Sequence, residues 1–542
     1  MPAELLHEWI LLMRYVLLFT LLFLFEVSPA QQMSSGGKLH PLQAIIDIRH
    51  YTIALEVDPQ QQKLGGYTEV DLVLSQSSDT LLLDLVNLFT IAKVTVNNAA
   101  ASFMHRDNRI YITRAGGFTS GKQLVKVTYA GSPAVAARPP WQGGFTWGKD
   151  GRGNPWVVIN CQFEGGKIYY VCKDHPSDEP NDGVDFMINV PKGLVVAGPG
   201  LLQKVTPQKN STVTYHWKTR YPISNYCTLF NIGKYQVVSR DYTSIDGNKV
   251  PVQFYVLEQD TAHANEVIDI RIRDTKILEK YFGEYPWIRE KIGIAQVSNP
   301  GMEHQTMITY GDKFTYAKVG GQNYSANLYH EYAHEWWANK VTNKDWAHMW
   351  IQEGIATYAE ALGFCDLAGE EAYQEQLFKH WSRIKNEKPL VQGKEINSVD
   401  TYSSDLYFKG SFFMHSLRYL MGDSLFFPTL KKLATDPQYT YHNLVITEDV
   451  EELFSRESGR NLQPLFDLYL RTTEKLDFTV KQTQMNSYQV KLKNLPMPLP
   501  VDITTSNGTQ RLIVTGEGLL LKSTTPPIID AKGFYFKKVT WE

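Results

Sequence analysis

The chain has 542 residues, more than a single hydrophobic core accommodates, so two to four domains are expected. Its formal net charge of −3 at pH 7, with 43% hydrophobic and 20% charged residues, is typical of a globular protein and excludes the compositions of disordered or collagen-like chains. Because the sequence has no basic excess, nucleic acid is not expected as a partner.

The N-terminal segment resembles an export signal. Residues 15–25, YVLLFTLLFLF, are apolar and small residues follow them, so we expect residues 1–30 to be a cleaved signal peptide. The mature protein would then be secreted or periplasmic, with no stable membrane span. An uncleaved anchor is the alternative, although the run is shorter than the about 20 residues that span a bilayer. Glu4 and Glu8 are unusual ahead of such a run, and initiation at Met13 would remove them.

The next part of the chain, from about residue 40 to 245, is predicted to consist mostly of strands. Short runs of alternating apolar and polar residues are separated by polar or glycine-bearing turns. Examples are YTIALEV, TEVDLVL, IAKVTV, RIYITR and LVKVTYA. We therefore expect residues 31–248 to form an N-terminal β domain.

Helical periodicity replaces this alternation in the middle of the chain. Residues 264–283, ANEVIDIRIRDTKILEKYFG, and the segment around 325–340 have apolar residues at helical spacing. Alternation returns near residue 478 in YQVKLKN, RLIVTG and FYFKKVTW. These changes predict a mixed domain over 249–475 and a small β domain over 476–542. The fold class is α+β and multidomain, with the three parts packed together.

Four cysteines occur, at positions 161, 172, 227 and 365, too few for a disulfide framework in a chain of this size. Pairing of Cys161 with Cys172 and four buried thiols both remain open. The cysteine spacings do not match a zinc ribbon.

The chemistry-bearing motif is HEYAH at residues 330–334. On a helix, His330 and His334 lie on one face, where both imidazoles reach a single zinc ion, and Glu331 lies between them. Two histidines do not complete a catalytic site, because catalytic zinc takes three protein ligands and keeps one position for water. Glu353, on a second predicted helix, is the candidate third ligand.

The whole pattern, HExxH followed after 18 residues by Glu353, resembles the zinc aminopeptidases typified by aminopeptidase N and leukotriene hydrolase. This resemblance implies one zinc ion per chain, bound by His330, His334 and Glu353, with Glu331 as the general base. It also implies an N-terminal β saddle domain, a thermolysin-like catalytic domain and a small C-terminal β sandwich. The large helical fourth domain of some members is expected to be absent, which would leave the cleft open.

A second motif, GMEH at residues 301–304, resembles the GxMEN strand of the same family, which binds the free amino end of the substrate. The family match implies that Glu303 binds the substrate ammonium, since a fixed carboxylate recognises such a group through charge-assisted hydrogen bonds. Gly301 and Met302 would line the same subsite. His304 replaces the family's asparagine, which changes the expected shape of the subsite. QFEGG resembles the TQxE segment and makes Glu164 a second amine-binding candidate.

A third motif, YFKG at residues 407–410, resembles the YxKG segment of the family. Tyr407 would then donate its phenolic hydrogen to the developing oxyanion, a contribution of about 3 kcal/mol. Glu360, seven residues after Glu353 and on the same helical face, is a candidate partner for one of the zinc-bound histidines. The neighbouring Trp336 and Trp337 are predicted to be core residues.

The predicted activity is therefore zinc-dependent removal of amino-terminal residues from peptides. Three alternatives remain open: a zinc endopeptidase, which shares the HExxH motif; an epoxide hydrolase; and an inactive peptide-binding homologue. Glu303 argues against the endopeptidase, and the complete set of catalytic residues argues against the inactive protein. The sequence leaves the preferred amino-terminal residue and the oligomeric state undetermined.

Overall fold

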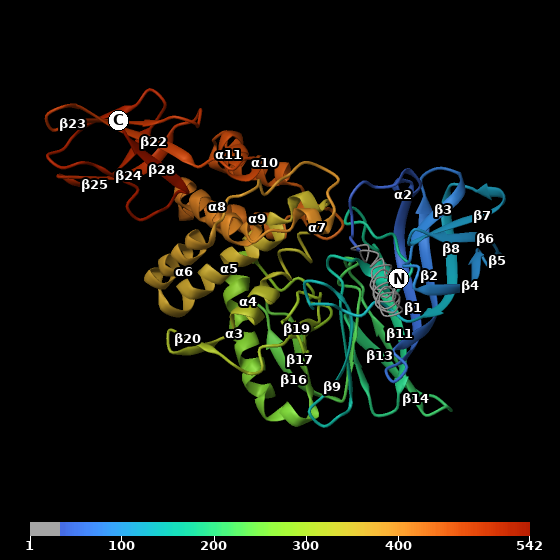
Figure 1. Ribbon diagram of the computed structural model, residues 1–542. Coiled ribbons are helices and arrows are strands. Elements are labelled where there is room, and N and C mark those ends of the chain that lie inside the picture. Colours follow the sequence, from blue (N-terminus) through green and yellow to red (C-terminus); the bar gives the residue numbers. More distant parts are fainter. Residues whose placement is uncertain (1–32) are drawn as a thin grey trace, which may run out of the picture. The chain divides into compact units, whose positions relative to one another are not determined.

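The structure is a computed structural model of the chain, and it describes residues 33–542 (Figure 1). The predicted signal peptide and the alternative start at Met13 lie outside the described residues. Within residues 33–542, no helix combines the length and the apolar character that crossing a bilayer requires.

The N-terminal part is built around a sheet of eight strands in the order β13-β14-β11-β1-β2-β8-β4-β5. These strands are β1 (Ile46–Asp58), β2 (Lys63–Leu74), β4 (Phe89–Val96), β5 (Ala99–Ala100), β8 (Gly121–Gly131), β11 (Val184–Pro191), β13 (Leu201–Pro207) and β14 (Thr212–Lys218). β1 pairs antiparallel with β2 and parallel with β11. Buried and less buried residues alternate along much of β1, as the sequence pattern predicts.

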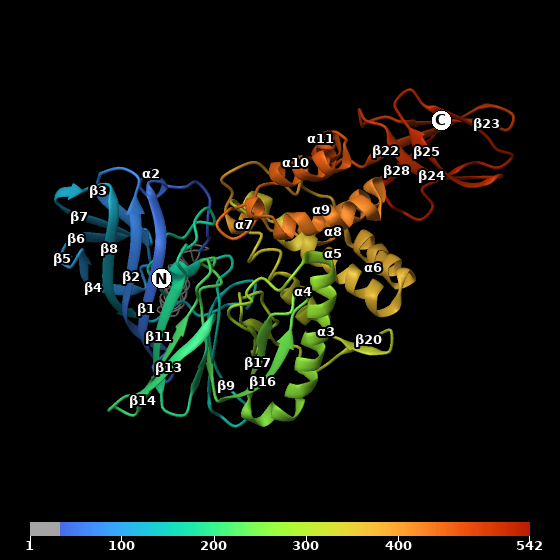
Figure 2. The ribbon, with the colours of Figure 1, turned by 180° about the vertical axis from the view of Figure 1, so that it is seen from behind.

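Two smaller sheets and short helical turns complete this strand-rich part (Figure 2). One sheet contains β3 (Ser78–Asp84), β7 (Arg109–Phe118) and β6 (Ser102–Arg106), and the other contains β12 (Val195–Ala197), β15 (Asn231–Gly233), β10 (Pro155–Asn160) and β9 (Gly144–Lys149). The helical turns are α2 (Pro41–Ala44) and η1 (Gly166–Ile168). The prediction of strands from about residue 40 to 245 is confirmed.

The next sheet positions the functional site. Its strands are β16 (Tyr235–Thr243), β17 (Lys249–Leu257), β18 (Ile292–Gln296) and β19 (Ile308–Tyr310), in sequence order. β17, β18 and β19 are parallel, so the chain crosses from β17 to β18 through η2 (Glu258–His263) and α3 (Ala264–Phe282). The predicted domain boundary after residue 248 separates β16 from β17, although the two strands pair along their length.

Helices dominate residues 326–471, as predicted. They are α4 (Ala326–Ala333), η3 (Trp346–His348), α5 (Trp350–Ala368), α6 (Glu370–Arg383), α7 (Ser398–Thr401), α8 (Asp405–Met421), α9 (Asp423–Thr435), η4 (Pro437–Tyr439), α10 (Thr447–Ser458) and α11 (Gln463–Arg471), preceded by the hairpin β20 (Ala317–Val319) and β21 (Gln322–Tyr324). α5 and α8 approach closely at Gly354 and Gly410. A Cβ atom on Gly410 would lie 2.8 Å from the Gly354 Cα. The glycine of the YFKG motif therefore allows the N-terminal part of α8 to pack closely against the N-terminal part of α5.

The C-terminal part contains two small sheets, with the orders β26-β23-β22-β28 and β25-β24-β27. Their strands are β22 (Leu476–Gln484), β23 (Ser487–Leu492), β24 (Leu499–Thr505), β25 (Gly508–Val514), β26 (Leu519–Lys522), β27 (Ile528–Ile529) and β28 (Lys537–Trp541). The sheets are anchored to α8 by stacking of Tyr419 on Phe534, with ring centroids 4.1 Å apart. The Ser416 hydroxyl also donates to the Phe534 carbonyl at 2.8 Å.

Some local expectations need revision. The helix around 325–340 is shorter than its apolar spacing indicates, because α4 ends at Ala333 and His334 caps it. The GMEH segment is not a continuous strand: a single bridge joins Met302 to Thr309. All four cysteines are free thiols, so Cys161 and Cys172 do not pair.

Candidate metal centre and substrate cavity

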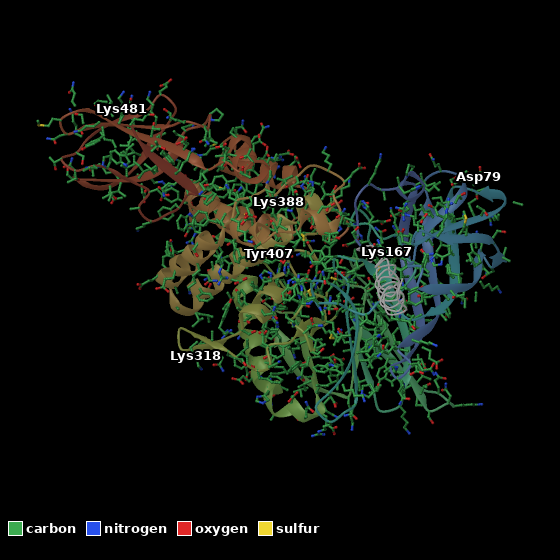
Figure 3. The ribbon with its side chains drawn as sticks, viewed as in Figure 1. Asp79, Lys167, Lys318, Lys388, Tyr407 and Lys481 are labelled. Atoms are coloured by element: carbon green, nitrogen blue, oxygen red, sulfur yellow. The ribbon has the colours of Figure 1, made fainter. Side chains whose placement is uncertain are left out.

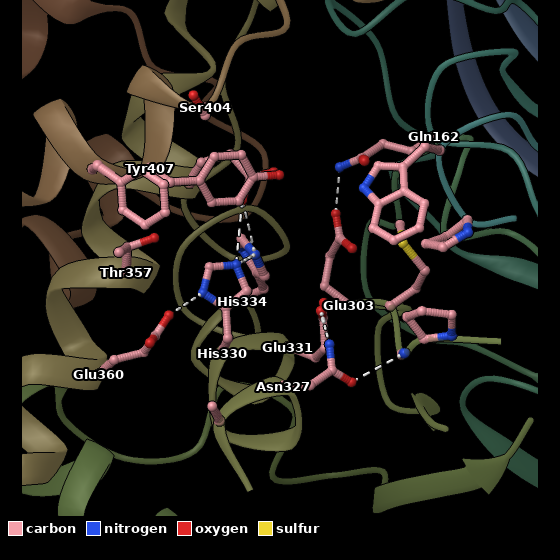
Figure 4. Close-up of a pocket in the computed structure, with 18 of the residues that line it drawn as sticks. Gln162, Glu303, Asn327, His330, Glu331, His334, Thr357, Glu360, Ser404 and Tyr407 are labelled. Atoms are coloured by element: carbon pink, nitrogen blue, oxygen red, sulfur yellow. Dashed lines mark hydrogen bonds and ion pairs between the residues drawn. The ribbon is translucent and has the colours of Figure 1, made fainter. Parts of the chain in front are cut away.

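His330, His334 and Glu353 come together where α4 and α5 pack, and each offers one ligand atom to the same small region. Figure 4 shows the two histidines side by side. The two histidine Nε2 atoms are 3.1 Å apart. Glu353 Oε2 lies 3.4 Å from each of them. The helical spacing that predicted the histidine pair holds even though His334 is the C-cap, because its backbone angles, φ −63° and ψ −17°, are still those of a right-handed helix.

These three residues fit a zinc ion. A tetrahedral ion with bonds of about 2.0–2.1 Å requires ligand atoms about 3.3–3.4 Å apart, close to the observed separations. Within the described chain, the buried Glu353 Oε2 has no hydrogen-bond partner. Burial opposes a charged imidazole, yet Glu353 and Glu360 raise the pKa of His330 well above its ordinary value. The triad therefore attracts positive charge.

Each histidine is oriented by a partner on its other ring nitrogen. His330 Nδ1 contacts Glu360 Oε1 at 2.8 Å, and His334 Nδ1 contacts the Trp337 carbonyl at 2.7 Å. With Nδ1 as the donor in both rings, the Nε2 lone pairs are left for a metal ion. The place predicted for Glu360 thus agrees with the structure. The carbonyl of Trp337 was not predicted, because a backbone group leaves no signal in the sequence.

Glu331 lines the same cavity and is held by a neighbour on its own helix. Its Oε1 accepts a hydrogen bond from Asn327 Nδ2 at 2.9 Å, and Asn327 Oδ1 accepts from the Gly301 N–H at 3.0 Å. Burial raises the pKa of Glu331 to about 8, with His330 opposing and Glu303 adding to the shift. A divalent cation held by the triad would lower this pKa.

Glu303 lines the cavity on the side of the N-terminal strands. Its Oε1 accepts hydrogen bonds from Gln162 Nε2 at 2.6 Å and from the Tyr226 hydroxyl at 3.0 Å. Burial raises its pKa, and His334 opposes this shift. Gly301 allows the segment to approach α4, since a Cβ there would lie 2.5 Å from Asn327 Oδ1. Gly301 and Met302 also line the cavity, as predicted.

Glu164 and His304 are not among the residues that line the cavity. Glu164 Oε1 accepts from the Gly143 N–H at 2.7 Å, and burial raises the pKa of this carboxyl to about 7. His304 is buried, and neither ring nitrogen has a partner in residues 33–542. The substrate contacts predicted for these two residues therefore have no support from the geometry. Gln162, two residues before Glu164, contacts Glu303 instead.

Tyr407 lies on the first turn of α8 (Figure 3), next to His330 (Figure 4). Its ring stacks on that of His330, with centroids 5.7 Å apart and planes at 28°. Burial, followed by the charge of Glu353, raises the pKa of this phenol well above its ordinary value. The hydroxyl consequently stays protonated and is available as a donor. Trp336 and Trp337 are fully buried, as predicted.

The cavity around these groups has a volume of about 530 Å³. Several lining residues were not identified from the sequence; those with polar or aromatic side chains include Trp141, Gln162, Asn327, Thr357, Gln376, His380, Arg383 and Phe408. Arg383 makes no ion pair with another described residue, and its guanidinium lies 5.3 Å from the centre of the Phe408 ring. The cavity thus combines carboxylates beside the triad with a cationic group on α6.

Part of the chain matches a known protein family. Residues 267–469 match the model of the peptidase family M1 domain. This match includes the metal-ligating triad, Glu303, Glu331 and Tyr407. It therefore spans both the helices that carry the candidate metal ligands and the segment that carries Glu303.

Two curated relatives share the same region. Leukotriene A-4 hydrolase of Xenopus laevis is 26% identical over 405 residues, covering 69% of this chain and 63% of the relative. Aminopeptidase M1-D of Oryza sativa is 22% identical, covering 82% of this chain and 52% of the relative. The chain thus spans about half to two thirds of the length of these relatives.

Solved structures show the same fold. The M1 zinc metallopeptidase of Deinococcus radiodurans has a TM-score of 0.64 and 22% identity, covering 78% of this chain and 93% of that one. A mutant of that enzyme bound to a Tyr-Ser-Ala substrate has a TM-score of 0.65 and 21% identity, covering 79% and 94%. At this identity the likeness establishes the multidomain α+β fold alone.

Proposed function

We propose that the chain is a zinc-dependent aminopeptidase of the peptidase M1 family, on the basis of the match of residues 267–469 to that family's domain and of the cavity geometry. Its substrates would be peptides with a free amino terminus. The observation that carries the proposal is that a metal-ligating triad and the buried carboxylate of Glu303 line one cavity. The triad would form the hydrolytic centre, and Glu303 would bind the ammonium group of the substrate.

The metal would be held by His330, His334 and Glu353. When bound there, zinc supplies a Lewis acid that polarises the scissile carbonyl and lowers the pKa of water. The protein's part is to keep both Nε2 atoms free and aimed at one point, which the Glu360 and Trp337 contacts achieve.

Glu331 would serve as the general base. Its carboxylate takes a proton from the attacking water as the water oxygen bonds to the carbonyl carbon. The same proton is then delivered to the leaving nitrogen as the carbon–nitrogen bond breaks, so the base is regenerated. Asn327 positions the carboxylate for both transfers.

Tyr407 would stabilise the negative charge that develops on the carbonyl oxygen. Its raised pKa keeps the phenol protonated, and stacking on His330 fixes the ring beside the triad. A donor aimed at charge that exists only in the transition state accelerates the reaction without tightening substrate binding.

Glu303 would bind the substrate ammonium. Two donors, Gln162 and Tyr226, already occupy its Oε1, which leaves Oε2 for the substrate. An ammonium at this position also offsets the cost of a buried carboxylate. The geometry favours Gln162 over Glu164 as the neighbour of this anchor.

We also propose the finer architecture that the family resemblance implies. Residues 31–248 would form a β saddle domain, residues 249–475 a thermolysin-like catalytic domain, and residues 476–542 a β sandwich. Residues 1–30 would direct export.

The test compares matched peptides with free and acetylated amino termini, using the zinc-loaded protein with and without a chelator. Acetylation removes the ammonium and leaves Glu303 without its partner, at a cost of about 2–5 kcal/mol. Cleavage should fall by at least about 30-fold, and free peptides should lose single residues from the amino end in mass spectra. Equal cleavage of both series, with internal fragments first, would identify an endopeptidase. Full activity after complete removal of metal would reject the zinc mechanism.

A further inference from the structure

A second, much smaller cavity lies beside the active site, where the strand-rich part meets the helical part. Its volume is about 20 Å³, enough for one water molecule or one monatomic ion. The lining comes from four segments of the chain: 175–179, 224–226, 342–346 and residue 352, together with Ser35.

The side chains that line this cavity carry an excess of oxygen atoms without partners. Both carboxylate oxygens of Glu179, Oε1 of Gln352, Oδ1 of Asn343 and Oγ of Ser224 are buried and accept no hydrogen bond from residues 33–542. Glu179 is 8% exposed, Gln352 is 1% exposed and Asn343 is fully buried, so bulk water does not serve them. Each such oxygen carries a desolvation cost.

The nearby protein groups compensate the Glu179 carboxylate only in part. The Thr342 hydroxyl lowers the pKa of Glu179, but it donates to the Ala338 carbonyl at 2.6 Å. Lys173 is committed to Asp178 at 2.7 Å and to the Ile46 carbonyl at 2.6 Å. Burial, together with Asp178, raises the pKa of Glu179 to about 8.

A single water molecule does not resolve the imbalance while Glu179 is ionised. The water brings two hydrogens and the Ser224 hydroxyl a third, whereas Glu179, Asn343 and Gln352 present four acceptor oxygens without partners among the described residues. Protonation of Glu179 would supply the fourth donor, and it is the alternative that the tests below separate from a bound cation. A hard cation accepts all of these oxygens at once, since carboxylate, amide and hydroxyl oxygens are its preferred ligands.

We propose that this cavity binds a single hard cation of the size of Ca²⁺, held by Glu179, Asn343, Gln352 and Ser224. The carboxylate supplies the negative charge, and the amide and hydroxyl oxygens complete the oxygen shell. The chelated ion joins a loop of the strand-rich part to the first turn of α5.

The position of this ion gives it a role in arranging the active site. Gln352 directly precedes the metal ligand Glu353 on α5. Tyr226 also lines the small cavity, and its hydroxyl donates to Glu303 at 3.0 Å. The ion therefore positions one residue beside the triad and one beside the amine anchor, without contacting substrate.

The first test is thermal unfolding of the zinc-loaded protein during a calcium titration. Calcium should raise the Tm of the wild type by about 2 °C or more at saturation, because a ligand bound only by the folded state stabilises it. Glu179→Gln should abolish the response. Glu290→Gln is the matched control, since Glu290 is also buried with an unpartnered Oε2 but does not line this cavity. It should respond as the wild type does.

A second measurement uses Tb³⁺ as a luminescent substitute for Ca²⁺. Trp346 lines the cavity, so its excitation should sensitise emission from the bound lanthanide. The signal should be displaced by calcium in the wild type, and no calcium-displaceable signal should remain in Glu179→Gln. The wild-type displacement tests the site even if the variant does not fold.

Three outcomes would overturn the proposal. One is a calcium response that persists in Glu179→Gln, and another is an equal shift with NaCl or MgCl₂ at matched ionic strength. The third is a wild-type Tm that ignores calcium and falls as pH rises from 4.5 towards 8, with Glu179→Gln removing the fall. That last pattern is the signature of a protonated carboxyl in the folded state, because an acid with a raised pKa loses its stabilising proton as pH rises.

Discussion

The two ends of the active-site cavity are constructed differently. The metal end is carried by α4 and α5: helical geometry fixes the spacing of His330 and His334, and the packing of α5 against α4 brings Glu353 to them. At the other end, where we propose that the substrate amine binds (the amine end), Glu303 lies in a segment joined to β19 by a single bridge. Hydrogen bonds from Gln162 and Tyr226 orient its carboxylate. Those two residues are 141 and 77 positions away in the chain.

This difference shows which site residues can be predicted from sequence patterns and which cannot. A helix repeats its geometry, so residues four apart in the sequence identify a shared face. A loop has no such repeat, and its side chains depend on tertiary contacts from distant segments. Substitutions at the two ends should accordingly differ in kind as well as in size.

The largest effect is expected at the metal end, from Glu331→Gln. The amide keeps the acceptor for Asn327 but cannot take a proton from water, so kcat should fall by about 10²- to 10⁴-fold. Zinc content, measured by atomic spectroscopy, should remain near one ion per chain. Glu353→Ala provides the contrast, because it removes a ligand and should lose the metal itself. A Glu331→Gln enzyme of near-normal kcat would show that the base lies elsewhere.

Tyr407→Phe should give the next largest effect, a fall in kcat of about 10²- to 10³-fold, because the oxyanion donor is removed while the ring remains. KM should change little, since the contact forms in the transition state. Tyr402→Phe is the comparison: Tyr402 also lines the cavity, but its ring packs edge-on against Tyr407 rather than on His330, and its hydroxyl interacts with that of Tyr407, so a smaller loss is expected. Equal losses from both variants would contradict the assignment.

The same contrast explains how much was predictable. The pairing of His330 with His334, and of Glu360 with Glu353, follows from helical spacing, whereas Glu353 as third ligand follows from the family resemblance; the structure brings all of them together. The strand-rich, helical and terminal β parts follow from alternation and periodicity. Neither Gln162 nor Asn327 was singled out, because an amide has no distinctive pattern and its role depends on a partner across the fold.

Glu164 illustrates a motif prediction that stays untested. Its motif resemblance predicts an amine ligand, whereas in the structure it accepts a hydrogen bond from the Gly143 N–H and is not among the residues that line the cavity. The contact lies within a loop whose path no local pattern encodes. In the sequence, Gly410 was identified only as part of the YFKG motif. The structure explains why a glycine is needed there: α8 approaches α5 so closely that a side chain at position 410 would collide with Gly354.

A smaller effect is expected at the amine end, from Glu303→Gln. The amide oxygen retains both donors, Gln162 and Tyr226, but the side chain no longer carries the charge that pairs with an ammonium. kcat/KM for a free peptide should fall by about 30-fold, a loss of about 2 kcal/mol. The acetylated peptide should lose much less. Glu164→Gln, assayed in parallel, should leave the preference for free peptides intact, and a comparable loss there would restore Glu164 as an amine ligand.

The smallest effect separates a structural carboxyl from a substrate-binding one and concerns the pH dependence of stability. Burial raises the pKa of Glu164 to about 7 from an ordinary 4.5. Because the folded state holds this proton more tightly than the unfolded state, the stabilisation is complete below about pH 4.5 and is lost as pH rises through about 7. Glu164→Gln keeps an acceptor for the Gly143 N–H without ionising, so it should be more stable than the wild type at pH 8 by about 1–3 kcal/mol. This advantage should shrink towards pH 4.5, as measured by the difference in Tm between the two proteins. A difference that does not vary with pH would show that this carboxyl is already ionised in the folded protein, as an amine ligand would be.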